Sequence, residues 1–190
     1  MVKVAVVYHS GYGHTEVVAQ HVFKGAASVS GVTSQIFKVD LITKTPEALN
    51  DFDAIIFGAP TYMGSVSAPF KVFMDATSGV WVKQLWKDKL AAGFTNSGSM
   101  SGDKFNSLVQ LVTFASQHSM NWISLGLMNE STAPGKENGD PACVNRIGAF
   151  LGAMAQSDNL PPTQTPPAGD LKTAELLGIR VAQAALRWNK

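Results

Sequence analysis

A short stretch of glycine, hydroxyl and aromatic residues follows the first apolar segment of the chain. This first loop is Ser10, Gly11, Tyr12, Gly13, His14 and Thr15, and a segment with helical spacing of apolar residues comes after it. Backbone N–H groups at a helix start lack partners and lie at the positive end of the helix dipole, so a phosphate binds well there. The hydroxyls of Ser10 and Thr15 can donate as well, and Gly13 permits close approach of the backbone. An ordinary strand-to-helix turn with a serine cap is the alternative interpretation.

Two common nucleotide-binding motifs do not match the first loop. It contains no lysine, whereas a P-loop ends in Gly-Lys-Ser/Thr to reach nucleotide phosphates and magnesium. It also lacks the third glycine of a dinucleotide-binding fingerprint. Neutral donors without a cation suit a buried phosphate monoester.

Two later loops have related compositions. The second loop, residues 60–64, contains Pro60, Thr61, Tyr62, Met63 and Gly64, and the third loop, residues 96–101, contains Asn96, Ser97, Gly98, Ser99, Met100 and Ser101. Each follows an apolar segment, so in a parallel sheet all three loops would meet at the carboxyl edge. Small and hydroxyl residues there could frame a flat polar ring, with backbone amides meeting its carbonyls and nitrogens.

The elements that would position these loops alternate along the chain. Strands are expected at residues 2–8, 33–40, 52–60, 89–99 and 120–127, and helices at 15–29, 67–79, 103–118 and 169–188. This alternation predicts an α/β fold: a flavodoxin-like, doubly wound, five-stranded parallel sheet of order 2-1-3-4-5 with helices on both faces. Residues 129–167, rich in glycine and proline, are expected to be mostly loop, either functional or mobile.

Composition predicts a single domain over residues 1–190 without nucleic-acid or membrane partners. The chain is 45% hydrophobic, its formal net charge is +1, and no apolar run is long enough to span a membrane. Cys143 is the only cysteine, and no histidine has a carboxylate partner at metal-ligand spacing, so no metal site is expected. The apolar start of the chain indicates a first strand, not a signal peptide, which favours a cytoplasmic location.

Four segments together carry a family resemblance. Residues 8–16, 53–81, 89–99 and 117–120 resemble the WrbA type of NAD(P)H:quinone oxidoreductase, a flavodoxin-like family of FMN enzymes. The resemblance implies that the first loop holds the FMN phosphate and that the second and third loops contact the isoalloxazine ring. It also implies that His118 belongs to the flavin site, and that Tyr12 and Trp81 face the nicotinamide or the quinone. Tyr12 and His118 are the candidates for orienting the substrate.

The implied activity is two-electron transfer from NAD(P)H to a quinone by a ping-pong mechanism in a homo-oligomer, a tetramer or a dimer. A flavodoxin-type electron carrier and an NAD(P)H-dependent FMN or azo reductase are the alternatives. Carriers are usually strongly acidic because they dock through complementary charge, and this chain is not. In the third loop, Met100 and Ser101 stand where the family has glycines, which affects the choice of acceptor.

Overall fold

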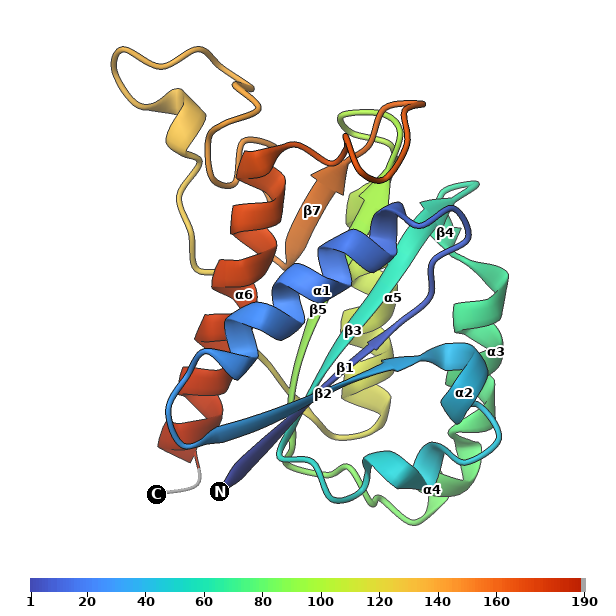
Figure 1. Ribbon diagram of the computed structural model, residues 1–190. Helices are drawn as coiled ribbons and strands as arrows, with labels where there is room; N and C mark the ends of the chain where they lie inside the picture. The colour runs from blue at the N-terminus through green and yellow to red at the C-terminus, as the bar shows by residue number, and fades with distance from the viewer. Residues whose placement is uncertain (189–190) are drawn as a thin grey trace.

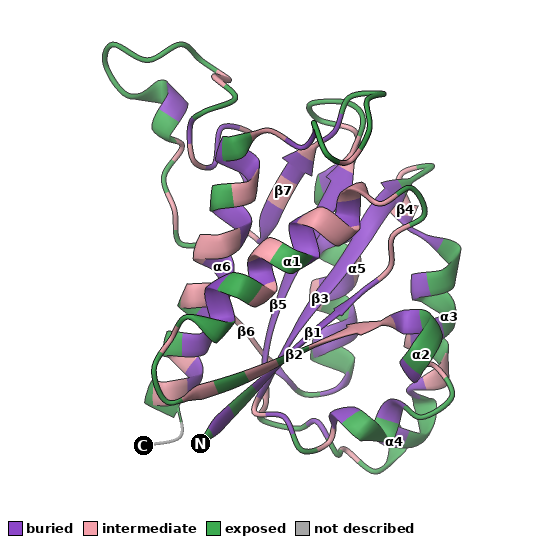
Figure 2. Ribbon diagram, in the orientation of Figure 1, coloured by how far each residue is buried: buried purple, intermediate pink, exposed green. Residues whose placement is uncertain are grey.

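The computed structural model describes residues 1–188 and has a parallel sheet at its centre (Figure 1). The main strands are β1 (Val2–Tyr8), β2 (Val32–Lys38), β3 (Ala54–Tyr62) and β5 (Leu90–Ser97), in the spatial order β2-β1-β3-β5. Each neighbouring pair is parallel, so the carboxyl ends of β1, β3 and β5 lie at one edge. Strands β1, β3 and β5 are almost wholly buried, as continuous apolar runs require (Figure 2).

Helices cover both faces of this sheet, which confirms the predicted architecture. The longer helices are α1 (His14–Ala27), α3 (Ala68–Ala76), α5 (Lys104–Gln117) and α6 (Ala168–Trp188), and the short ones are α2 (Val39–Ile42), α4 (Ser78–Val82), η1 (Pro46–Leu49) and η2 (Glu130–Thr132). Helices α1 and α6 pack together on one face, where Val4, Val6 and Ile56 point (Figure 1). Helices α3 and α5 cover the other face, over Val7, Ile55 and Phe57.

The fifth strand differs from the prediction for residues 120–127. Only β6 (Asn121–Trp122) pairs with the start of β5, and β7 (Ala153–Gln156) pairs with its end, from Phe94 to Ser97. The fifth position is therefore split, and residues 123–152 form an insertion between the two halves. Segment 153–156 has no β-branched residue, so local propensity gives no strand signal there, and pairing with β5 decides its conformation.

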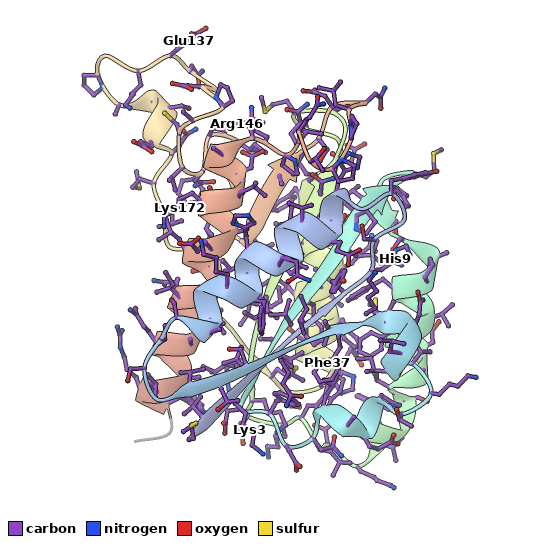
Figure 3. All side chains as sticks on the ribbon, in the orientation of Figure 1. Lys3, His9, Phe37, Glu137, Arg146 and Lys172 are labelled. Carbon is purple, nitrogen blue, oxygen red and sulfur yellow. The ribbon has the colours of Figure 1, made fainter. Side chains whose placement is uncertain are left out.

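The middle of the insertion forms a projecting arm, at the top left of Figure 1, and Glu137 lies on its outer part (Figure 3). Residues 129–167 are mostly loop, as expected, apart from the short elements η2 and β7. The second loop is more regular than expected. Strand β4 (Ser65–Val66) folds back on Thr61 and Tyr62, with Met63 and Gly64, both at positive φ, as its two-residue turn.

Two kinds of feature are absent from the described residues. Among residues 1–188, no helix combines the length and the apolar character that crossing a membrane requires. The same residues hold no group of three or more histidine, cysteine, aspartate or glutamate side chains placed to bind a metal ion. The cytoplasmic location stays a prediction.

Candidate functional site

A pocket of about 370 Å³ lies at the carboxyl edge of the sheet, where four loops meet. Three are the loops singled out in the sequence, and the fourth is residues 157–160, directly after β7. The lining residues are Ser10, Tyr12, His14, Thr15, Pro60, Thr61, Tyr62, Asn96, Ser97, Gly98, Ser157, Asp158, Asn159 and Leu160. The sheet topology thus brings together residues that lie up to 150 positions apart in the chain.

The first loop leaves the start of helix α1 open to an anion. Gly13 caps the helix in the left-handed conformation, with φ +91°, and no side chain caps the N–H groups of the first turn. The hydroxyl oxygen of Ser10 accepts a hydrogen bond from the Gly13 N–H at 3.1 Å. On the fourth loop, the Leu160 carbonyl lies 2.8 Å from Nε2 of His14 and so can accept its N–H. Uncapped N–H groups beside hydroxyls and an imidazole form a ready-made phosphate cradle.

Two tyrosines stand at the mouth of the pocket. Tyr12 is 77% exposed and Tyr62 is 38% exposed, and their rings meet edge to face with centroids 6.1 Å apart. The Tyr62 hydroxyl lies against the first loop, since a Cβ built on Gly11 would come within 2.8 Å of it. Burial raises the pKa of Tyr62, so its phenol is neutral at pH 7. Large exposed aromatic faces beside a pocket offer a stacking surface for a planar ligand.

Buried hydroxyl and amide groups fix the floor of the pocket. Oγ1 of Thr61 lies 2.8 Å from Oγ1 of Thr95 and donates to Ser107 on α5 at 2.7 Å. Ser157 donates to the Asn96 side-chain carbonyl at 2.8 Å, which ties the fourth loop to the third. These bonds hold the loop ends in one arrangement before any ligand arrives.

A buried ionic network stands behind the third and fourth loops. Arg146 and Asp170 form a bidentate pair at 2.8 and 3.1 Å, with side chains 4% and 1% exposed, next to the start of α6 (Figure 3). Burial raises the pKa of Asp170, while Arg146 opposes that shift. Gln156 joins the pair to the pocket: its side-chain N–H groups donate to the Gly98 carbonyl at 3.0 Å and to Asp158 at 2.7 Å. Arg146 in turn donates to Gln156 at 2.9 Å.

Comparison with known proteins shows the family to which the chain belongs. A family model described as NADPH-dependent FMN reductase matches residues 27–131. The chain is 44% identical over 187 residues to flavodoxin FldP of Pseudomonas aeruginosa, across 96% of both proteins. The chain belongs to the FMN reductase family.

Two further similarities agree with this family. The crystal structure of a flavodoxin, WrbA-like protein from Agrobacterium tumefaciens has a TM-score of 0.75 and 39% identity, over 98% of this chain and 99% of that one. Quinone-oxidoreductase QR2 of Triphysaria versicolor is 34% identical over an alignment of 142 residues, with a coverage of 65% of this chain and 69% of that protein. The chain is thus a WrbA-type, flavodoxin-like FMN oxidoreductase, and FMN is its cofactor.

The pocket fits FMN on its own geometry. The uncapped start of α1 suits the phosphate, and the hydroxyl and amide groups of Thr61 and Asn96 suit a polar ring edge. A side chain at Gly13 would clash with the segment after the fourth loop, because a Cβ there would lie 2.8 Å from Cγ of Pro162. The phosphate would thus be held by neutral donors and a helix start instead of a lysine or arginine.

The pocket gathers most, but not all, of the predicted FMN contacts. Ten predicted residues line it: Ser10, Tyr12, His14, Thr15, Pro60, Thr61, Tyr62, Asn96, Ser97 and Gly98. Gly11 and Gly13 shape the first loop without lining the pocket. Met63 and Gly64 form the hairpin tip, where the Met63 side chain is fully exposed.

The end of the third loop turns away from the FMN pocket. Ser99, Met100 and Ser101 are absent from its lining, and Met100 and Ser101 instead border a separate hollow with Phe105 and Phe150. The Ser99 carbonyl points inward, where it accepts a hydrogen bond from Lys104. Non-glycine residues at 100 and 101 are therefore compatible with FMN binding.

Sequence reasoning missed the fourth loop, which supplies Ser157, Asp158, Asn159 and Leu160. Its polar residues follow a strand, as in the other loops, but that strand is only four residues long and carries no strand signal. The one available signal was the length and composition of residues 129–167, which indicated a functional segment without locating it.

His118 and Trp81 lie outside the FMN pocket of their own chain. Both line another hollow of about 540 Å³, between helices α3, α4 and α5. Helix α5 starts after the carboxyl edge of the sheet and runs back for 14 residues before His118, which places His118 roughly 20 Å from the start of the helix at 1.5 Å per residue. Neither residue lines the FMN pocket, so the geometry of a single chain gives their assignment to the flavin site no support.

The environment of His118 also excludes a proton-donating imidazolium at neutral pH. The ring is 2% exposed, packs on Trp86 with centroids 4.5 Å apart, and its Nε2 lies 2.9 Å from the Thr77 hydroxyl. Nδ1 is buried and has no hydrogen-bond partner. Burial lowers the pKa of His118 to about 4, so the imidazole is neutral at pH 7.

Acid should therefore destabilise the fold through His118. Its pKa is about 4 in the folded chain and near 6.5 in the unfolded one, so the unfolded state binds more protons between these values. Stability is fully present above pH 6.5 and falls as the pH drops toward 4, by up to about 3 kcal/mol. His118→Phe keeps the aromatic packing and removes the titration. Denaturant unfolding at pH 7 and pH 4.5 should show a smaller loss for this variant, and equal losses would refute the assignment.

Proposed function

We propose that this FMN oxidoreductase transfers two electrons from NAD(P)H to a quinone by a ping-pong mechanism. The observation that carries the proposal is the open, aromatic mouth of the FMN pocket, formed by Tyr12 and Tyr62. A nicotinamide and a quinone are both flat rings that stack on such a surface, and one opening would serve them in turn. FMN, when bound, supplies the two-electron chemistry itself.

The chain's own residues would bind FMN and orient the substrate. The start of α1, with Ser10 and Thr15, would hold the phosphate, while Thr61 and Asn96 would hold the ring edge. Tyr12 would orient the substrate ring, since its side chain is exposed beside the pocket. The reaction as proposed needs no side-chain acid or base.

Trp81 and His118 could take part only from a second subunit, because they lie far from the pocket in their own chain. We propose a homo-oligomer, a tetramer or dimer, in which the hollow between α3, α4 and α5 faces a neighbour's FMN pocket. Trp81 is 43% exposed there, so it is free to pack against another surface. His118 is 2% exposed and neutral, so it would support this surface from below through its contacts with Thr77 and Trp86, and would not act as a charged proton donor.

Initial rates test the proposed reaction. With FMN-loaded protein, NADH or NADPH and benzoquinone are varied against each other while pyridine-nucleotide oxidation is followed. Parallel double-reciprocal lines are expected, because the first product leaves before the quinone binds. Tyr12→Ala should raise KM for both substrates more than it lowers kcat, since it would remove uniform binding.

Sedimentation of the same FMN-loaded sample provides the control for assembly. A dimer or tetramer is expected, and a fully active monomer would remove Trp81 and His118 from the proposed site.

Intersecting double-reciprocal lines in the initial-rate experiment would contradict the ping-pong mechanism. They would require both substrates to bind together, which one shared opening does not allow.

An electron carrier is the second candidate function, because a 44% identical relative is named a flavodoxin. A carrier would pass electrons between proteins and show no turnover with NAD(P)H and benzoquinone alone. The nearly balanced charge, 15 Lys and Arg against 14 Asp and Glu, gives such docking no strong field. The initial-rate experiment separates these two functions directly.

A further inference from the structure

A fully buried lysine lies directly behind the third loop of the FMN pocket. Lys104, the first residue of α5, is 0% exposed. Its ammonium donates to the Ser99 carbonyl at 2.6 Å and to the Ser97 hydroxyl at 3.0 Å. Ser97 lines the pocket, so only one residue separates the charge from the ligand. Burial lowers the pKa of Lys104 to about 8, which leaves it charged at pH 7.

The neighbouring buried charges do not cancel this one. Arg146 and Asp170 neutralise each other in their bidentate pair, which leaves the Lys104 charge as the excess of the cluster. Two further carboxylates lie near Lys104: Asp158 at the pocket wall and Asp103, the residue before Lys104 in the chain, and both are exposed to solvent. Solvent screens an exposed charge much more than a buried one. The field at the pocket from this side is therefore positive.

We propose that the buried cluster of Lys104, Arg146 and Asp170 stabilises the reduced form of FMN over the oxidised form. A nicotinamide that delivers two electrons and one proton leaves the ring with one additional negative charge. A positive charge fixed behind the third loop favours that charge without reorganising, as preorganised groups do at developing anions. Lys104 acts through the loop and does not touch the substrate, so it is a positioning residue.

Separate titrations of oxidised and reduced FMN test this inference. Lys104→Gln keeps hydrogen-bond donors for Ser99 and Ser97 and removes the charge. It should weaken binding of reduced FMN about tenfold more than binding of oxidised FMN, the order expected for one nearby charge. For a two-electron couple, a tenfold change lowers the midpoint potential by about 30 mV. A merely structural role would weaken both forms equally and leave the potential unchanged, which would overturn the proposal.

Two further variants test whether the change of the midpoint potential has the expected sign and whether it is confined to charges near the pocket. Asp158→Asn removes a negative charge at the pocket wall and should raise the potential, and a decrease would contradict the proposal. Lys89→Gln is the matched control, because Lys89 is a partly buried lysine just before β5, bonded to the carbonyls of Asn50 and Phe52. It lies at the opposite edge of the sheet, so the potential should stay unchanged.

This inference rests on FMN binding in the pocket and not on the identity of the electron acceptor. Failure of the wild-type protein to bind FMN would contradict the site itself. Normal FMN binding with no change of potential in Lys104→Gln would contradict only the role given to the buried cluster. Because both forms of FMN are titrated, even a weakly binding variant gives the ratio of the two dissociation constants. That ratio distinguishes an effect on the potential from a general loss of binding.

Discussion

Replacing Arg146 with methionine should lower the free energy of unfolding by about 3–5 kcal/mol, the usual cost of removing one partner of a buried ion pair. Asp170 would stay 1% exposed without its bidentate partner. Arg146 also donates to Gln156, which holds the Gly98 carbonyl and Asp158, so FMN affinity should fall as well. Denaturant unfolding at pH 7 measures the first effect, and FMN titration measures the second.

The double variant Arg146→Met/Asp170→Asn is the control for this result. Asparagine keeps a carbonyl oxygen that can accept the Gln156 backbone N–H, now bonded to Asp170 at 2.8 Å. With both charges gone, the double variant should be more stable than Arg146→Met alone by at least about 1 kcal/mol. A double variant less stable than the single one would show that packing, and not the unpaired carboxylate, accounts for the loss.

Gly13→Ala should weaken FMN binding by about tenfold or more. Gly13 has φ +91°, a conformation that costs an alanine on the order of 1–2 kcal/mol. In the free protein the first loop can relax to release this strain, and restoring the binding conformation then weakens FMN binding by a factor of ten for each 1.4 kcal/mol. The new Cβ would also lie 2.8 Å from Cγ of Pro162, next to the fourth loop. The phosphate cradle would be distorted from both sides. Fluorescence titration of the apoprotein with FMN gives the dissociation constant.

Gly135→Ala is the matched control for backbone strain. Gly135 has φ +82°, and a Cβ there would have no neighbour within 4 Å. It lies two residues before Glu137, which is on the projecting arm (Figure 3). This variant should lose similar local stability and bind FMN as tightly as the wild type. Unchanged affinity in Gly13→Ala would mean that the first loop does not hold the phosphate.

The central fold was predictable because its signals are local. Strands β1 and β3 are continuous apolar runs, and each is followed by glycine and hydroxyl residues where a parallel sheet binds ligands. The first three loops could therefore be assigned to one edge of the sheet from the sequence alone.

The remaining features depend on contacts between distant residues. Strand β7 exists because Phe94–Ser97 offers it a free edge, and its four residues alone do not favour a strand. Arg146 and Asp170 are 24 positions apart, so neither the pair nor its role behind the pocket shows in the sequence. The family resemblance assigns His118 to the flavin site, whereas the course of α5 places this residue at the other end of the sheet.

The most direct test of the central claim is the visible spectrum of the protein after incubation with FMN and desalting, followed through one anaerobic cycle. We expect a retained flavin spectrum that bleaches on addition of NADH or NADPH and returns on addition of benzoquinone. Gly13→Ala, treated alongside, should retain much less flavin. A wild-type protein that keeps FMN but is reduced by neither nucleotide would contradict the proposed reaction, and one that keeps no FMN would contradict the site.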